Sequence, residues 1–202
     1  MSSPVTTAIA ESIVHKGFAI TPQFLEPRLV RELRDEALAL RREGTFRRAG
    51  IGRGGSWHVD PKVRSDFVHW LDQNELTPLQ DAVMRRYEQL RVEINQRLLL
   101  GLFSWEGHLT VYPAGAHYAR HLDRFRDAMH RTVSTTLYLN DTWSKRDGGQ
   151  LRLYLDSASG EFVDVLPQGG TLVTFISDRF EHEVIAARRE RVSLTGWFAR
   201  RV

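Results

Sequence analysis

Hydrophobic residues recur at helical spacing in two segments of the first half of the chain. The first segment begins at Pro27, a residue typical of a first helical turn, and its apolar positions lie three or four residues apart: Leu29, Leu33, Ala37 and Leu40. The second begins at Thr77 and Pro78, a common helix start, and carries one apolar stripe over residues 79–98. This pattern predicts two amphipathic helices.

From about residue 109 the hydrophobic period changes to two, which is typical of half-buried β-strands. Gly-, Asn- and Pro-containing turn signals separate the apolar runs. Six strands are predicted, at residues 109–112, 132–139, 151–155, 162–166, 171–175 and 192–198. Several short strands separated by turns indicate a β-sandwich or barrel, with the helices packed outside it.

Length and composition limit the possible classes of protein. The 202 residues suit one domain, which we divide into supporting helices with a covering loop (residues 1–108) and a β core (residues 109–202). Hydrophobic residues at 42% and charged residues at 26% exclude a disordered chain. The absence of Cys excludes disulfides and thiolate sites, so any metal must be held by His and carboxylates.

The start of the chain lacks a basic stretch followed by an apolar run, and no apolar run approaches the ~18 residues of a membrane span. We therefore expect a soluble cytoplasmic protein without a membrane partner. The formal net charge is only +3, and the Arg clusters are interpreted mainly as solvated faces. A nucleic-acid partner is not expected.

Two short patterns suggest known sites but lack the context that those sites need. Residues 50–55 satisfy the G-x-G-x-x-G pattern, but no apolar strand precedes them and Pro61 follows soon after, which excludes a dinucleotide site. His117 and His121 have the spacing of a zinc-protease helix, but Tyr118 replaces the required Glu. The Gly-rich segment 46–61 is instead predicted to be a loop or hairpin able to act as a lid.

A candidate metal site begins at His121 and Asp123. On an extended chain these two residues project from the same face and can hold one ion. His182, which follows a predicted strand, is the candidate third ligand. Two His and one carboxylate form a facial triad with open positions, as expected of non-haem Fe(II).

Arg191 lies nine positions after His182 and opens the last predicted strand. Alternation along this strand places it on one face with Ser193, Thr195 and Trp197. A guanidinium close to a metal would anchor the far carboxylate of a dicarboxylate co-substrate. A salt-bridged strand terminus is the alternative interpretation.

Together these residues resemble the Fe(II)- and 2-oxoglutarate-dependent prolyl hydroxylases, in particular the branch that contains the hypoxia-sensing enzymes. The resemblance also rests on four further motifs, at residues 112–115, 118–121, 138–140 and 148–152. It implies an α+β, mainly β fold: a double-stranded β-helix (jelly-roll, cupin-like) core supported by the N-terminal helices. Segment 46–61 then corresponds to a loop that covers the substrate.

The resemblance assigns a role to each matching residue. His121, Asp123 and His182 would be the catalytic iron ligands, and Arg191 would bind the C5 carboxylate of 2-oxoglutarate. Further co-substrate contacts would come from four residues: Tyr138, Tyr112, Thr195 and Leu151. Four others would lie near the substrate: Tyr118, Trp197, Arg53 and Trp57. Core packing is the alternative role for the aromatic residues among them.

The implied reaction uses Fe(II), 2-oxoglutarate and O₂, with ascorbate as a candidate reductant, and hydroxylates a prolyl residue, at C4, in a protein. Succinate and CO₂ are released. The protein substrate is expected in the translation apparatus, by analogy with short bacterial-type relatives. Segment 124–131 is more basic than in the hypoxia-sensing enzymes, which leaves substrate identity open.

Three alternatives remain at this point. A hydroxylase of a small molecule or free amino acid is one, because sequence does not reveal pocket size. A nucleic-acid demethylase of the same superfamily is another, although those enzymes carry a second Arg six positions after the co-substrate Arg, where this chain has Trp197. The third is a non-catalytic binding module, which the intact ligand set disfavours.

Overall fold

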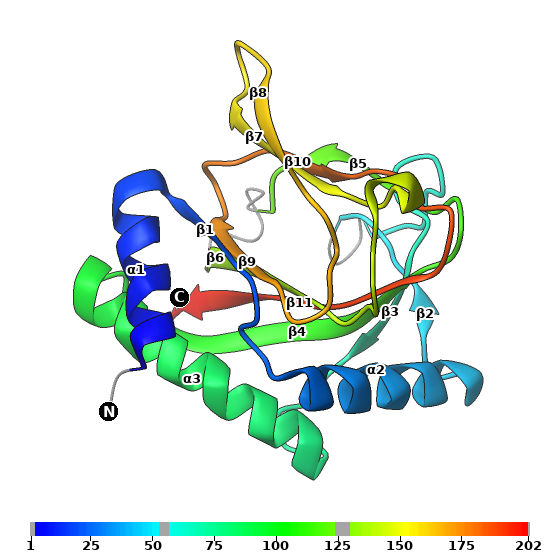
Figure 1. Cartoon of the computed structure of the whole chain (residues 1–202), viewed down its shortest axis with the longest axis horizontal. Helices are drawn as coiled ribbons and strands as arrows, with labels where there is room; N and C mark the ends of the chain where they lie inside the picture. Colours follow the sequence, from blue (N-terminus) through cyan, green and yellow to red (C-terminus); the bar gives the residue numbers. More distant parts are fainter. Residues whose placement is uncertain (1–2, 53–56, 124–129, 202) are drawn as a thin grey trace.

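The computed structural model describes residues 3–52, 57–123 and 130–201. Its helices are α1 (Pro4–Lys16), α2 (Pro27–Arg42) and α3 (Pro78–Leu98). They lie along one side of a large antiparallel sheet, and a smaller sheet lies on the other side (Figure 1). The helices therefore support the large sheet from outside, as the sequence predicts.

The large sheet has seven strands in the described residues. In spatial order these are β1 (Phe18–Thr21), β9 (Leu172–Ile176), β6 (Arg131–Tyr138), β11 (Arg191–Arg200), β4 (Leu102–Tyr112), β3 (Phe67–Trp70) and β2 (Arg47–Arg48). The smaller sheet contains β5 (Tyr118–His121), β10 (His182–Val184), β7 (Leu151–Asp156) and β8 (Glu161–Val165). All six predicted strands are confirmed, and the two facing sheets form the predicted jelly-roll core.

Helix α3 begins as the sequence predicts. The Thr77 hydroxyl accepts a hydrogen bond from the Gln80 backbone N–H, while the Gln80 side chain accepts one from the Thr77 backbone N–H. This capping box satisfies backbone donors at the helix start. The apolar stripe of α3 is buried against the large sheet, in the cluster that also holds Leu194 and Phe198.

Two parts of the fold differ from the prediction. The sequence analysis did not predict α1, although Ser3 caps its start, Pro4 opens it, and Gly17 ends it in the left-handed conformation that glycine favours. Strand β4 begins at Leu102 rather than at residue 109, because it pairs with the whole of β11 up to Arg200. The helical part therefore ends at Leu98, and the predicted division at residue 108 falls inside β4.

Segment 46–61 forms a hairpin in its described part. Ile51 and His58 exchange two backbone hydrogen bonds of 2.9 and 3.0 Å. Strand β2, which precedes Ile51 in the chain, pairs with β3. The predicted loop or hairpin is confirmed to this extent, while residues 53–56 lie outside the described part. None of the described helices combines the length and the apolar character needed to cross a membrane.

The central strand β11 separates two environments. Val192, Leu194 and Phe198 face the helices and are buried in the apolar cluster. The alternate residues, which begin at Arg191, face the smaller sheet, as the period of two predicts. Their cross-strand neighbours on β4 and β6 include Thr110, His108, Thr136 and Ser134, so this face of the large sheet is unusually polar.

Candidate metal and co-substrate site

Two histidines face each other across the smaller sheet. His121 ends β5, His182 begins β10, and the two residues are directly paired in the antiparallel ladder. Their ring centroids are 4.2 Å apart. His182 also pairs with Leu153 on β7, so the backbone of both histidines is held by strand pairing.

Hydrogen bonds to backbone carbonyls orient both imidazole rings. The Nδ1 atom of His121 lies 2.8 Å from the Ala119 oxygen, and that of His182 lies 3.2 Å from the Phe180 oxygen. A carbonyl only accepts, so Nδ1 carries the proton in each ring and Nε2 is left with a free lone pair. This is the arrangement typical of metal-binding histidines.

Asp123 completes the triad. Its two carboxylate oxygens lie 3.6 Å from His121 Nε2 and 3.7 Å from His182 Nε2. One donor atom from each residue can be chosen so that all three lie within 4.8 Å of one another. The three sequence-predicted ligands are therefore brought together at a spacing that suits one metal ion.

The protonation states at this site suit metal binding. Burial opposes ionisation of Asp123, but the His182 and His121 imidazoles and the Ser134 hydroxyl outweigh it and hold the pKa of Asp123 well below its usual range. Burial, reinforced by His121, lowers the pKa of His182 to about 4. At neutral pH the carboxylate is ionised and His182 is neutral, as a metal requires of its ligands.

Arg191 is fully inside the protein, with 1% of its surface exposed. Its Nε donates to the Gly149 carbonyl at 3.0 Å, and its guanidinium lies 4.9 Å from the Tyr112 ring and 5.0 Å from the Tyr138 ring. Among the described residues, no Asp or Glu pairs with this charge, and neither its Nη2 atom nor the Tyr138 hydroxyl has a hydrogen-bond partner.

Buried charges and buried hydroxyl groups without partners are costly in a folded protein. A ligand carboxylate between Arg191 and Tyr138 would satisfy both groups at once, since it accepts charge-assisted hydrogen bonds from each. The residues present therefore fit a dicarboxylate such as 2-oxoglutarate. The prediction that Arg191 forms a salt-bridged strand end is not supported within the described part of the chain.

Trp197 lies on the same face of β11 as Arg191 and forms part of an aromatic wall. The Arg131 guanidinium stacks on its ring at 3.6 Å, and the rings of His108 and Trp70 lie at 5.7 and 6.2 Å. The Trp197 Nε1 is buried and has no hydrogen-bond partner among the described residues. Trp70 is half exposed, so this wall extends from the interior to the surface.

The other predicted site residues occupy different positions. The Tyr118 ring stacks on His121 at 3.6 Å. The Thr195 hydroxyl lies 3.3 Å from the Ser193 hydroxyl, on the face of β11 that carries Arg191. Leu151 is buried in the apolar cluster between the sheets, together with Tyr112 and Tyr138. Trp57 is 55% exposed, and Arg53 lies outside the described residues. Ligand contacts by these residues stay predictions.

The sequence analysis missed several residues of this region. Ser134 donates to Asp123 at 2.6 Å. Arg64 forms a two-pronged ion pair with the buried Asp66 and lies over the Tyr118 ring at 4.3 Å. The only signal for the ion pair was the i, i+2 spacing of two opposite charges, which also occurs on many exposed strands.

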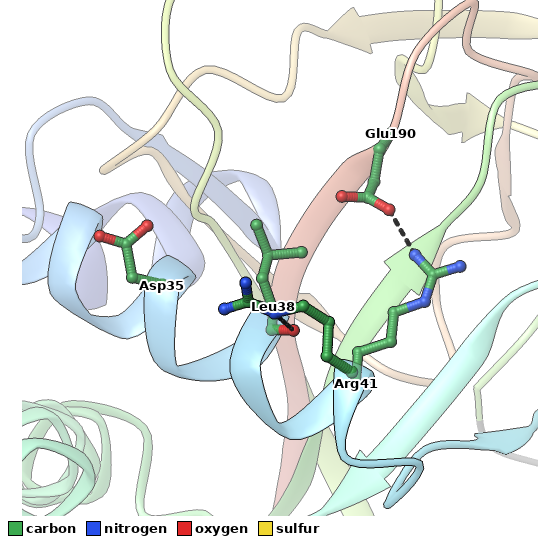
Figure 2. A pocket seen from close by; sticks show the side chains of 5 residues that line it. Asp35, Leu38, Arg41 and Glu190 are labelled. Atoms are coloured by element: carbon green, nitrogen blue, oxygen red, sulfur yellow. Dashed lines mark hydrogen bonds and ion pairs between the residues drawn. The ribbon is translucent and has the colours of Figure 1, made fainter.

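A separate hollow of about 580 Å³ lies between α2 and the start of β11. It is lined by Asp35, Leu38, Arg41, Arg42 and Glu190, and Arg41 forms an ion pair with Glu190 across it (Figure 2). The hollow is a polar groove at the surface, and its lining residues include acidic and basic side chains but no His. The groove is distinct from the triad, whose ligands face the space between the sheets.

Comparison with known proteins agrees with this geometry. The family model described as "2OG-Fe(II) oxygenase superfamily" matches residues 107–199 of this chain. A crystal structure of a Pseudomonas putida prolyl-4-hydroxylase is 41% identical, with 98% of this chain and 100% of that chain covered and a TM-score of 0.87. A Trichoplax adhaerens prolyl hydroxylase in complex with a hypoxia-inducible factor peptide is 27% identical, with 96% and 88% covered and a TM-score of 0.84.

A hypoxia-inducible factor prolyl hydroxylase of Caenorhabditis elegans is 30% identical over 151 residues, which are 67% of this chain. The match covers 20% of that relative, so the chain spans about a fifth of its length. The Pseudomonas putida enzyme, by contrast, is matched from end to end. The chain therefore belongs to the 2OG-Fe(II) oxygenase superfamily, whose enzymes use Fe(II), 2-oxoglutarate and O₂.

Proposed function

We propose that this enzyme hydroxylates a prolyl residue of a protein substrate, at C4. The observation that carries the proposal is the joint presence, between the two sheets, of a ligand-competent His-Asp-His triad and a buried Arg without an anionic partner among the described residues. The similarity to prolyl hydroxylases over nearly the whole chain supports the prolyl assignment.

In this proposal, His121 and His182 bind Fe(II) through Nε2, and Asp123 binds it through a carboxylate oxygen. When bound, Fe(II) and 2-oxoglutarate supply an O₂-dependent oxidation that inserts one oxygen atom into a C–H bond and releases succinate and CO₂. The chain itself supplies three ligands and leaves the remaining coordination positions open. It also fixes both imidazoles before the metal arrives, which lowers the cost of binding.

Arg191 holds the distal carboxylate of 2-oxoglutarate, with Tyr138 as the second donor. The positive charge of Arg191 is already buried, so the ligand does not have to strip water from it. Tyr112, Thr195 and Leu151 line the same space. Burial raises the pKa of Tyr138 to about 12, so its hydroxyl keeps its proton and can donate it in a hydrogen bond.

The substrate reaches the metal along the aromatic wall. Trp197 and Tyr118 would contact the prolyl ring and its neighbours, and Trp57 of the hairpin would cover the bound segment. Arg53 stays a proposed substrate contact from the resemblance. Aromatic faces suit a proline ring because they offer apolar contact without requiring hydrogen bonds. They also exclude water from the reacting carbon.

We further propose that the protein substrate belongs to the translation apparatus and that the reaction takes place in the cytoplasm. The substrate proposal comes from the resemblance to short bacterial-type prolyl hydroxylases, whereas the location is the expectation of the sequence analysis. The basic composition of segment 124–131 would favour an acidic stretch beside the target proline. Ascorbate is proposed as the reductant that keeps the iron reduced.

The metal and co-substrate assignment predicts a spectroscopic signal. Anaerobic addition of Fe(II) and 2-oxoglutarate to metal-free protein should give a visible metal-to-ligand charge-transfer band, and Asp123→Ala should abolish it because one of three ligands is lost. Titration followed by absorbance measures this. Phe162→Ala, a half-exposed position on β8, is the control and should keep the band. A wild-type protein without any band would contradict the assignment.

The buried imidazole of His108 predicts a pH dependence of stability. Burial, followed by Arg64 and Arg131, lowers the pKa of His108 to about 3, whereas the unfolded chain has the ordinary value near 6.5. Between these values the unfolded state binds the extra proton, so the free energy of unfolding falls as pH falls from about 6.5 toward 3 and is unaffected above 6.5.

His108→Gln should therefore reduce the slope of the unfolding free energy between pH 4 and 6 by up to about 1.4 kcal/mol per pH unit. Denaturant unfolding of the metal-free protein at several pH values measures this slope. The pH range above 7 provides the control, since the slopes of wild type and His108→Gln should coincide there. Equal slopes for wild type and His108→Gln would show that the buried imidazole is protonated in the folded state as easily as in the unfolded state.

The substrate assignment predicts a specific mass change. Incubating a proteome from cells lacking this enzyme with active protein, Fe(II), 2-oxoglutarate and ascorbate should add one oxygen atom, about 16 Da, to a proline in one or a few proteins. Tandem mass spectrometry locates the modified residue, and omission of 2-oxoglutarate provides the control. Oxygen found only on free amino acids or other small molecules would favour the alternative hydroxylase.

A further inference from the structure

We propose that Ser134, supported by Ser177, is a positioning residue that fixes the Asp123 carboxylate on the large sheet and thereby sets the metal affinity of the site. This inference rests on the proposed metal site and goes beyond it, because neither serine is a ligand. Its basis is a chain of two short hydrogen bonds that joins the triad to strands β6 and β9.

Asp123 differs from the two histidines in how the backbone holds it. His121 and His182 lie in paired strands, whereas Asp123 lies in a bend after β5 and is paired with no strand of the described part. The one hydrogen bond that its carboxylate receives from the described residues comes from Ser134, at 2.6 Å to Oδ2. Ser134 therefore supplies to the carboxylate the restraint that strand pairing supplies to the imidazoles.

The direction of each hydrogen bond in the chain is determined. An ionised carboxylate can only accept, so the Ser134 hydroxyl donates to Asp123. Its oxygen is then free to accept from the Ser177 hydroxyl, 2.9 Å away. The Ser177 backbone N–H donates to the Thr132 carbonyl at 3.0 Å, which anchors this end on β6.

Burial makes this chain hard to replace. Ser134 is 2% exposed and Ser177 is 0% exposed, so water has little access to the position of either hydroxyl. Removing the Ser134 hydroxyl would take from the largely buried Asp123 carboxylate the hydroxyl donor that the described residues give it, which is costly for an ion with little exposure.

The chain also joins the two sheets through the metal site. Both imidazoles belong to the smaller sheet, whereas Ser134 lies on β6 and Ser177 follows β9 of the large sheet. A metal held by all three ligands therefore couples the smaller sheet to the larger one through Asp123 and Ser134. Metal binding should stabilise the fold, and it should do so less when this connection is cut.

The test uses metal-free full-length protein with Mn(II) or Co(II) alone, so that turnover is not needed. Isothermal titration gives the Mn(II) dissociation constant, and the visible Co(II) bands report the coordination. Ser134→Ala should weaken binding at least about tenfold, the range found when partners of metal ligands are removed, and should reduce the metal-induced rise in Tm. Ser134→Thr, which keeps the hydroxyl, should restore most of the affinity.

Ser177→Ala should show a smaller loss of metal affinity in the same direction, because it acts on Asp123 through Ser134. Thr135→Val is the matched control: Thr135 is buried on the opposite face of β6 and donates to the Gly196 carbonyl. It should lower the stability of the protein without weakening metal binding.

Mn(II) binding by Ser134→Ala within twofold of wild type would overturn the inference. An equal loss of affinity in Thr135→Val would also overturn it, since the loss would then reflect general destabilisation. If the wild-type protein binds neither Mn(II) nor Co(II), both the proposed function and this inference are overturned. If the wild type binds these metals and only Ser134→Ala fails to show the loss, this inference alone is overturned.

Discussion

A guanidinium group enclosed in the protein, with no counter-ion among the described residues, is the constraint on which the site depends. Arg191 is 1% exposed, and the described residues give it one carbonyl acceptor and two aromatic neighbours but no carboxylate. Such a charge is tolerated when a ligand can complete its partners. The polar face of β11 carries Arg191, while the opposite face of the same strand packs against the helices through Leu194 and Phe198.

The metal site uses the two sheets in different ways. The smaller sheet provides both imidazoles in one register pair, so their separation is fixed by backbone geometry. The large sheet contributes Arg191, the proposed co-substrate anchor, and Ser134, which donates a hydrogen bond to the Asp123 carboxylate. The two facing sheets of the jelly-roll therefore bring residues that are distant in sequence into one site. Neither sheet contains the whole site.

Sequence reasoning recovered the parts that short patterns encode. The His121/Asp123 pair, His182 and Arg191 were predictable because alternation in a strand fixes which side chains share a face, and because a permanent charge in an apolar strand is unusual. Six of the eleven strands in the described residues, and two of the three helices there, followed from periodicity. Ser134 and the Arg64–Asp66 pair were not predictable, since a serine or an ion pair gains its meaning only from long-range contacts. Helix α1 had capping signals, but it lies outside the segments with the strongest apolar stripes.

The central claim is that Arg191 binds the distal carboxylate of 2-oxoglutarate. It is tested most directly by comparing 2-oxoglutarate with 2-oxopentanoate, which has a methyl group in place of that carboxylate, in the anaerobic Fe(II)-loaded protein. Wild type should prefer 2-oxoglutarate by at least about 100-fold in dissociation constant, as expected for charge-assisted hydrogen bonds, and Arg191→Met should lose most of this preference while still binding Fe(II). Equal affinity for the two ligands in wild type, or an unchanged preference in Arg191→Met, would contradict the account.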